Sequence, residues 1–293
     1  MNYTEFLCNI KQSMTEVFDS SFNICVKPIE KNNGTYLDGL IICNPDYNIS
    51  PTIYLNPYYH RYLEGVSIKD ICDDIFTTYN QYMPAANFDI ESVIDFEKCK
   101  DGIIYKLINY KKNEGMLSHI PHLKYLDFAV IFQISLNNTN FGNAAITIHE
   151  QLVERWGVTL TDLQRLAAQN TPRLFPHQLL DLNELVSKVF DMSAYGDVTD
   201  MYALSNIQKT NGASVILYEG LLNDIANELN SNLVLLPSSI HEFIIMPHEY
   251  DTDLAYLKEL INSVNDTSVS DEEILSNHPY VYDKITKCLM IPD

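Results

Sequence analysis

Apolar and polar residues recur along the chain with two different periods, and these periods predict a mixture of helices and strands. Apolar residues spaced three to four positions apart predict amphipathic helices over residues 3–18, 68–82, 159–168 and 253–264. Short alternating or continuous apolar runs predict strands over residues 22–29, 37–43, 51–55, 125–136, 144–149, 201–205 and 280–290. The Asn33-Gly34 pair between the first two strands predicts a hairpin.

Weaker patterns predict further elements between these segments. Residues 88–96, 102–113 and 182–190 are expected to be helical, and the Asn-rich run at 137–140 is expected to form a turn. The Thr171-Pro172 step is expected to end the preceding helix, because a proline disfavours the helical conformation of the residue before it.

Residues 212–247 have a high apolar content and are expected to form the most deeply buried unit of the chain. The pattern predicts strand, helix, strand, tight turn and strand, in this order. The turn spans Pro237–Glu242, so it places two serines, a histidine and a glutamate between two apolar strands. We therefore expect a chemical site, if the protein has one, at this corner.

The order of the predicted elements indicates the fold class. Several strands follow one another directly as hairpins, whereas a parallel βαβ chain would alternate strands with helices. The sequence therefore predicts an α+β fold with mainly antiparallel sheets flanked by helices. We expect two lobes: an N-terminal lobe over residues 1–118, and a C-terminal lobe over residues 119–293 that contains the 212–247 unit.

The charge of the chain restricts its partners. Its 39 acidic and 19 basic residues give a net charge of −20, which repels nucleic acid phosphates and anionic membranes. We therefore expect no direct nucleic acid binding and no membrane binding. A second interpretation is an acidic inhibitor that mimics nucleic acid. It is disfavoured because the carboxylates are spread along the chain instead of being concentrated in one region.

Cysteine usage and the N-terminal residues indicate a cytoplasmic protein. The six cysteines include no C-x-x-C pair, and the chain begins MNYTEFL, without the basic and apolar regions of a signal peptide.

The phosphate-binding patterns G-x-G-x-x-G and G-x-x-x-x-G-K-[ST] are also missing from the sequence. We therefore expect no metal and no cofactor.

Three His-Glu pairs, at residues 149–150, 241–242 and 248–249, raise the question of a metal site. None continues as the H-E-x-x-H pattern of zinc proteases. Neighbouring side chains on a strand point to opposite faces, so they do not bind one metal jointly. A long-range site that combines His149, His241 and a carboxylate stays open. The favoured interpretation is that these are hydrogen-bonded histidines at strand ends.

Two further motifs are candidate sites. Ser238 and Ser239 lie close to His241, but the G-x-S-x-G nucleophile elbow is missing, so their hydroxyls are expected to satisfy backbone groups of the turn. Asn170 and Arg173 follow the end of a predicted helix. Arg173 would either clamp an anionic ligand or pair with an acidic side chain, and the ion pair is favoured in so acidic a chain.

Several motifs together resemble those of an uncharacterised family, a domain of unknown function found mostly in cytosolic proteins of gut-dwelling Firmicutes. They span most of the chain: Asp38-Gly39-Leu40, Pro51–Asn56, Tyr105–Tyr110, Trp156-Gly157-Val158, Asn170–Arg173 and Leu236–Glu242. The resemblance implies no activity. It carries over Asn170, Arg173, Ser238, Ser239, His241 and Glu242, either as functional residues or as turns that define the fold.

Three functional hypotheses follow. The leading one is a non-catalytic cytosolic binding or regulatory protein with a protein or small-molecule partner, because the catalytic and cofactor signatures are missing from the sequence. The second is a hydrolase that uses His241 with Glu242 or His149 as acid-base groups. The third is the acidic inhibitor that mimics nucleic acid. Whether the chain is an enzyme is left open.

Overall fold

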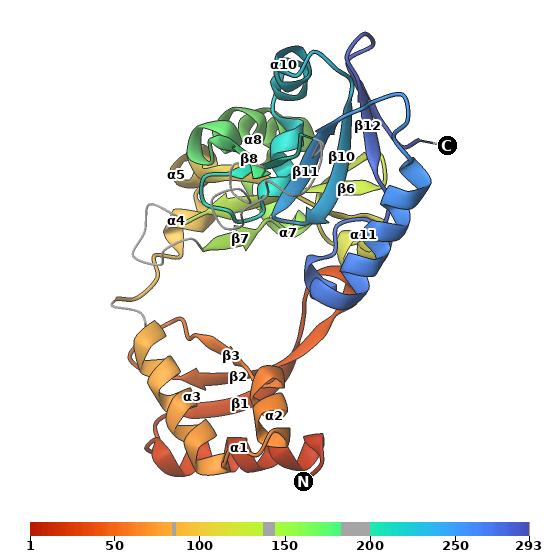
Figure 1. The fold of residues 1–293 in the computed structure, drawn as a ribbon. Helices are drawn as coiled ribbons and strands as arrows, with labels where there is room; N and C mark the ends of the chain where they lie inside the picture. The colour runs from red at the N-terminus through yellow and green to blue at the C-terminus, as the bar shows by residue number, and fades with distance from the viewer. Residues whose placement is uncertain (84–85, 137–143, 183–199, 293) are drawn as a thin grey trace.

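The structure, a computed structural model, describes residues 1–83, 86–136, 144–182 and 200–292, and in these ranges it combines helices with three sheets (Figure 1). Each strand pair in the described ranges is antiparallel. The α+β class predicted from the order of elements is therefore confirmed. The turn expected at 137–140 and nearly all of the helix expected at 182–190 lie outside the described residues.

The first sheet and its helices form around one buried cluster. The elements are α1 (Tyr3–Val17), β1 (Asn23–Glu30), β2 (Tyr36–Cys43), β3 (Thr52–Tyr54), α2 (Asn56–Leu63) and α3 (Ile68–Tyr82). The three strands pair in the order β1-β2-β3, and α1 and α3 contribute Phe6, Ile10, Met14, Ile71 and Ile75 to the cluster. The predicted helices at 3–18 and 68–82 and the predicted hairpin are confirmed.

The second sheet corrects one prediction. After α4 (Glu91–Ile94) and α5 (Phe96–Cys99), residues Ile103–Asn109 form strand β4, not the helix expected over 102–113. This strand pairs along its whole length with β6 (Phe128–Ser135), which also pairs with β5 (His122–Tyr125) and β7 (Ala145–Thr147). Its apolar side chains are buried on both faces of the sheet, so the alternation that marks a half-buried strand is missing.

The same pairing bears on the expected division of the chain. Residue 118 separates β4 from β6, so the predicted lobe boundary falls within the span of one sheet. The buried cluster around α1 and α3 contains only residues from Phe6 to Tyr79. The division into two lobes stays a prediction.

The third sheet has six strands in the described ranges, in the order β13-β12-β10-β11-β9-β8. Their bounds are β8 His177–Asp181, β9 Tyr202–Asn206, β10 Leu233–Ser239, β11 Glu242–Pro247, β12 Tyr280–Asp283 and β13 Cys288–Met290. The hairpin of β10 and β11 is central, and Leu233, Leu235, Phe243 and Ile245 of this hairpin are fully buried. Within the 212–247 unit, the predicted helix, the last two strands and their turn are therefore in place.

Two further predictions about local structure are wrong. Residues Gly212–Leu217 form the 3₁₀ helix η4, where a strand was expected. Helix α8 (Leu160–Leu174) continues past Thr171, with Pro172 inside its last turn. The remaining helices are α6 (Glu114–Leu117), α7 (Glu150–Trp156), α10 (Leu221–Glu228) and α11 (Leu254–Ser268), and the short 3₁₀ segments are η1 (Asn32–Gly34), η2 (Lys100–Gly102), η3 (Lys111–Asn113) and η5 (Asp271–Glu273).

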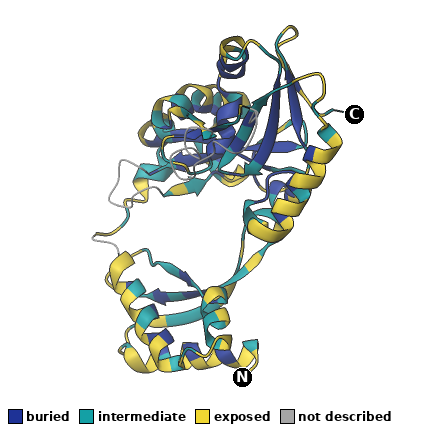
Figure 2. Cartoon of the chain, viewed as in Figure 1, coloured by how far each residue is buried: buried dark blue, intermediate teal, exposed yellow. Residues whose placement is uncertain are grey.

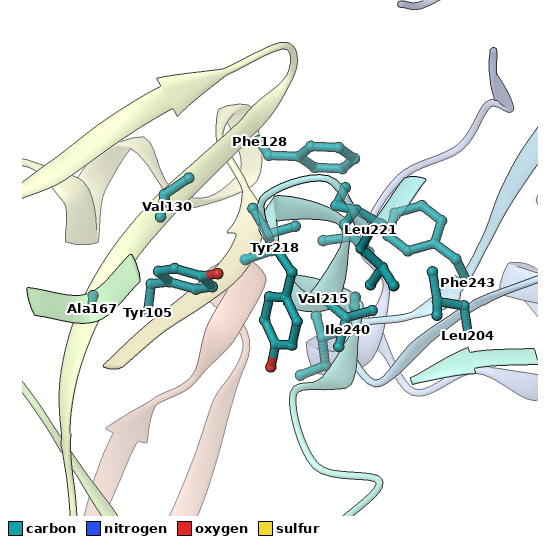
Figure 3. Close-up of a cluster of buried hydrophobic side chains, with 14 of the residues drawn as sticks. Tyr105, Phe128, Val130, Ala167, Leu204, Val215, Tyr218, Leu221, Ile240 and Phe243 are labelled. Atoms are coloured by element: carbon teal, nitrogen blue, oxygen red, sulfur yellow. The ribbon is translucent and has the colours of Figure 1, made fainter. Parts of the chain in front are cut away.

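The largest buried cluster lies where the second and third sheets meet, together with α8 and η4 (Figure 2). Figure 3 shows part of it, with Tyr105 and Val130 from the second sheet beside Tyr218, Ile240 and Phe243. Tyr105 and Tyr218 lie with their ring centroids 6.3 Å apart. Among the helices that the structure describes, none combines the length and the apolar character needed to cross a membrane.

Candidate functional site

His241 lies at the predicted corner, in the turn where Ser239 of β10 pairs with Glu242 of β11. The four polar side chains of this corner are half-buried, whereas Ile240 between them is 6% exposed and belongs to the main core. The corner is therefore anchored in the core by its isoleucine, and its polar groups remain partly open to solvent.

Hydrogen bonds fix the imidazole ring of His241. The backbone N–H of Asn211 donates to Nδ1 over 3.0 Å, so Nδ1 carries no proton. The proton is then on Nε2, which lies 3.3 Å from Oε1 of Glu273. The carboxylate that meets His241 is therefore Glu273 of η5, not Glu242.

The other polar groups of the corner are used locally. The Ser238 hydroxyl donates to Glu242 over 3.2 Å, and the Ser239 hydroxyl accepts the backbone N–H of His241 over 3.0 Å. Ser205 on β9 donates to the His241 carbonyl over 2.7 Å. Of the two serines of the turn, Ser239 has the expected role of satisfying a backbone group, whereas Ser238 binds a side-chain carboxylate.

His149, the other histidine of the hydrolase hypothesis, is an exposed residue at the N-cap position of α7. Within the described residues, no hydrogen bond or salt bridge joins it to His241 or Glu242. Among the described residues, His149 is therefore not linked to the His241 corner by a contact of either kind.

Asn170 and Arg173 hold one loop in place. Asn170 is 6% exposed, and its amide nitrogen donates to the carbonyls of Lys100 and Ile103 over 2.8 and 3.0 Å. Arg173 donates to the Asp101 carbonyl and to Oδ1 of Asn170 over 2.8 and 3.1 Å. In place of the expected ion pair, the guanidinium thus binds uncharged oxygens, and both residues attach α8 to the loop that begins β4.

The tip of the β1–β2 hairpin contacts the segment around η5, and the hairpin reaches toward it in Figure 1. Asn33, in a left-handed conformation with φ 62°, donates through its side chain to the carbonyls of Asp271 and Ile274 over 2.8 and 2.7 Å. Its backbone N–H donates to Asn113 over 2.8 Å, and Asn32 donates to the Glu272 carbonyl over 2.7 Å. Asparagine tolerates the left-handed conformation and supplies these bonds.

This contact forms one wall of a cavity of about 320 Å³. The hairpin contributes one side and the second sheet contributes the floor, and the His241 corner, η5 and α6 also line it. The lining residues are Glu30, Lys31, Asn32, Lys106, Ile108, Met116, Ile131, Gln133, Thr147, Ile240, Glu272 and Glu273. The volume is at the lower end of the range of small-molecule pockets in proteins.

Lys106 is the distinctive residue of this cavity. It lies in the middle of β4 between buried apolar neighbours and is half-buried itself. Burial and the nearby Lys31 ammonium lower the pKa of Lys106 to about 8, although Glu272 and Glu273 oppose the shift. In the part of the chain that the structure describes, the Lys106 ammonium has no hydrogen bond and no salt bridge.

The lining of the cavity contains charged side chains of both signs. Two ammonium groups, of Lys31 and Lys106, share its lining with the carboxylates of Glu30, Glu272 and Glu273. Within the described ranges, no salt bridge joins one of these lysines to one of these glutamates. Lys31 instead lies over the ring of Tyr54, 4.3 Å from its centroid. Such a lining offers several carboxylate acceptors and two cationic donor groups to a small polar molecule.

The sequence analysis missed Lys106, Glu272 and Glu273. Lys106 interrupts an otherwise apolar run, and a cation at the centre of a buried strand was the available signal. It was overlooked because the run was interpreted as a helix. The two glutamates belong to an exposed-looking acidic run, so their sequence alone carries no such signal.

A separate cluster surrounds Asp127. Its carboxylate accepts from the Tyr280 hydroxyl over 2.6 Å, and from His278 Nε2 and the Ser276 hydroxyl over 3.1 Å each. His278 Nδ1 lies 3.1 Å from the Pro279 carbonyl, so both ring nitrogens face acceptors. The hydrogen bond to Asp127 raises the pKa of His278. Burial alone would raise the pKa of Asp127, but the hydrogen bonds from His278 and Tyr280 outweigh burial and hold this pKa below its usual value. This pair joins the β5–β6 turn to β12.

The described residues include no group of three or more His, Cys, Asp or Glu side chains placed to hold a metal ion. The long-range combination of His149 with His241 is therefore not assembled there.

Comparisons with known proteins add one finding. A family model described as "Family of unknown function (DUF5688)" matches residues 3–284. No curated protein matches the chain, and no solved structure matches it.

Proposed function

The chain belongs to the DUF5688 family, to which no function is assigned, and from this premise we propose that it is a non-catalytic cytoplasmic binding or regulatory protein whose small polar ligand occupies the cavity beside Lys106. The ligand carries hydrogen-bond donors for the glutamates and an acceptor for Lys106. No direct contact with nucleic acid or membranes is part of this proposal, since the net charge of −20 opposes both.

The observation that carries the proposal is the arrangement of charge in the cavity. Lysines and glutamates in proteins are normally solvated or paired with one another. Here the Lys106 ammonium group lies half-buried on β4 without an ion-pair partner among the described residues, and the glutamates of η5 share its lining but lie beyond salt-bridge distance. A ligand that bridges the two kinds of group would replace the water that the Lys106 ammonium group has lost on burial.

The walls of the cavity support binding in a preformed site. The floor is strand β4, paired over seven residues with β6. The hairpin wall is held by side-chain hydrogen bonds of Asn32 and Asn33, which include three bonds to backbone carbonyls of residues 271–274. A site fixed in this way loses little conformational entropy when a ligand enters.

Ligand-observed NMR with a defined set of small molecules tests the proposal. The set contains glycine, γ-aminobutyrate, glycerol, glycolaldehyde, succinate and inorganic phosphate. We expect at least one of the donor-rich compounds to bind, and we expect Lys106→Met and Glu272→Gln to weaken its binding at least about fivefold, as the loss of a charged hydrogen bond predicts. Lys112→Met and Glu249→Gln are matched controls on exposed residues.

Two results would contradict the proposal. One is binding that the Lys106 and control variants weaken equally, because the site would then lie elsewhere. The other is the absence of binding by all six compounds at millimolar concentration.

A further inference from the structure

Lys106 differs from a lysine that serves only as a fixed positive charge. A structural cation is normally kept charged by a carboxylate within ion-pair distance. Among the described residues Lys106 has no such partner, and the charges that act on it include a second ammonium group, that of Lys31. Burial and Lys31 outweigh the opposing effect of Glu272 and Glu273, so the fraction of neutral amine, the nucleophilic form, is larger than for an exposed lysine.

The cavity also contains a group that can move protons beside this amine. Glu273 lines the cavity with Lys106, and the Nε2–H of His241 holds its carboxylate 3.3 Å away. The Asn211 N–H holds the other side of the same ring. The carboxylate is therefore positioned by a fixed donor and has a second oxygen for other contacts.

We propose that Lys106 forms a reversible imine with a small hydroxyaldehyde or hydroxyketone bound in this cavity. The inference rests on the proposed binding of a small polar ligand and names its class. Hydroxyl groups of such a compound donate to the glutamates of the lining, while its carbonyl carbon faces the amine of Lys106.

The reaction balances without an oxidant or reductant. The lone pair of Lys106 Nζ attacks the carbonyl carbon while the C=O π bond breaks onto oxygen, and Glu273 carries one proton from Nζ to that oxygen to give a neutral carbinolamine. Glu273 then carries the second Nζ proton to the hydroxyl group, which leaves as water while the C=N bond of the neutral imine forms. Hydrolysis by the reverse steps releases the carbonyl compound and the free amine, so the capture is a binding event without turnover.

The lowered pKa of Lys106 gives the expected size of the effect. With a pKa of about 8, roughly 10% of Lys106 is neutral at pH 7, compared with about 0.03% for a lysine of pKa 10.5. The neutral fraction is thus about 300-fold larger, and part of this advantage is lost because a less basic amine is a weaker nucleophile. We expect Lys106 to react at least about tenfold faster than an exposed lysine.

The test is reductive trapping with glycolaldehyde and sodium cyanoborohydride at pH 7, followed by intact mass measurement and peptide mapping. Among the lysines we expect the first adduct at Lys106, with the exposed Lys112 as the internal reference. The trapping rate at Lys106 should rise with pH to a plateau with a midpoint near 8. Glu273→Gln should slow trapping at Lys106, whereas Glu249→Gln on the exposed surface should leave it unchanged.

The outcomes separate this inference from the binding proposal. Labelling of Lys106 no faster than Lys112 would overturn the imine, even where the NMR experiment shows a ligand whose binding depends on Lys106. Lys106→Arg keeps the charge but has no reactive amine, so it should abolish the preferred adduct while the variant still binds γ-aminobutyrate or glycerol as the native protein does. The inference would also be contradicted if the native protein and the Lys106→Arg variant both carried their preferred lysine adduct at the same other lysine.

Discussion

Replacement of Asp127 by alanine is the sharpest test of how the sheets are joined. Asp127 is the common acceptor of Tyr280, His278 and Ser276, and Tyr280 is fully buried. The substitution leaves the Tyr280 hydroxyl without its acceptor and leaves His278 without its counter-charge. An unsatisfied buried donor costs roughly 1–3 kcal/mol, and breaking a buried ion pair costs roughly 3–5 kcal/mol.

Partial exposure lowers these values. The side chains of His278 and Asp127 are 23% and 30% exposed, so water replaces part of the lost interaction. We therefore expect Asp127→Ala to lower the free energy of unfolding by about 3 kcal/mol. Tyr280→Phe, which leaves the carboxylate two of its donors, should cost only about 1 kcal/mol.

The effect should depend on pH. Because the pKa of His278 is raised above 6.5 in the folded protein, its contribution is fully present below pH 6.5 and is lost as the pH rises through the raised value. Because the pKa of Asp127 is lowered below 3.8, its contribution is present above pH 3.8 and is lost as the pH falls. The difference between native protein and variant should therefore be largest between pH 4 and 6.5.

Urea denaturation followed by the fluorescence of Trp156, the single tryptophan, measures these values at pH 5.5 and pH 9. A loss below about 1 kcal/mol at pH 5.5 would refute the reasoning about buried hydrogen bonds. A loss that is equal at the two pH values would refute the assignment of a charged His278.

Three further predictions concern stability. Lys106→Met should raise the free energy of unfolding at pH 7 by about 2 kcal/mol, because it removes a half-buried charge that has no ion-pair partner among the described residues. This gain should fade as the pH rises from 8 to 10.5, because Lys106 of the folded native protein becomes neutral in this range. Gly212→Ala should cost at least about 2 kcal/mol in the same urea assay, because a Cβ there would lie 2.5 Å from the His241 carbonyl oxygen and 2.8 Å from the Asn206 nitrogen. Asn170→Ala should cost about 2 kcal/mol by loss of its hydrogen bonds to two backbone carbonyls, one buried and one partly buried, and ligand binding measured by NMR should be unchanged.

Tertiary contacts explain the predictions of local structure that were wrong. Pro172 was expected to stop α8, yet the residues before it are fixed by β4: Asn170 donates to the Ile103 carbonyl, and the Thr171 hydroxyl accepts the Tyr105 N–H over 3.1 Å. These bonds hold the last turn in place despite the proline. In β4 itself, core packs on both faces of the sheet, so the sequence shows one continuous apolar run that fits either a helix or a strand.

The candidate site was found in part. The turn at His241 was predicted, because apolar strands on either side of a polar tetrapeptide give a local signal. Its partner Glu273 was not, because the two residues are 32 positions apart and no periodic pattern links them. Lys106 and the hairpin residues Lys31 and Asn32 are farther still from η5 in sequence.

The sequence by itself determined the α+β class, the antiparallel hairpins, the longer amphipathic helices and the membership of a family of unknown function. The first three depend on neighbours within about ten positions, where side-chain periodicity and turn chemistry act directly, and the family membership depends on motifs spread over most of the chain. Only the tertiary structure decided which strand packs on both faces, which helix tolerates a proline and which charged groups share a cavity. Those features arise when segments 66 residues apart, as in α8 and β4, or 240 residues apart, as in the hairpin and η5, are buried against one another. Burial then sets both the hydrogen-bond partners of a side chain and the pKa of Lys106.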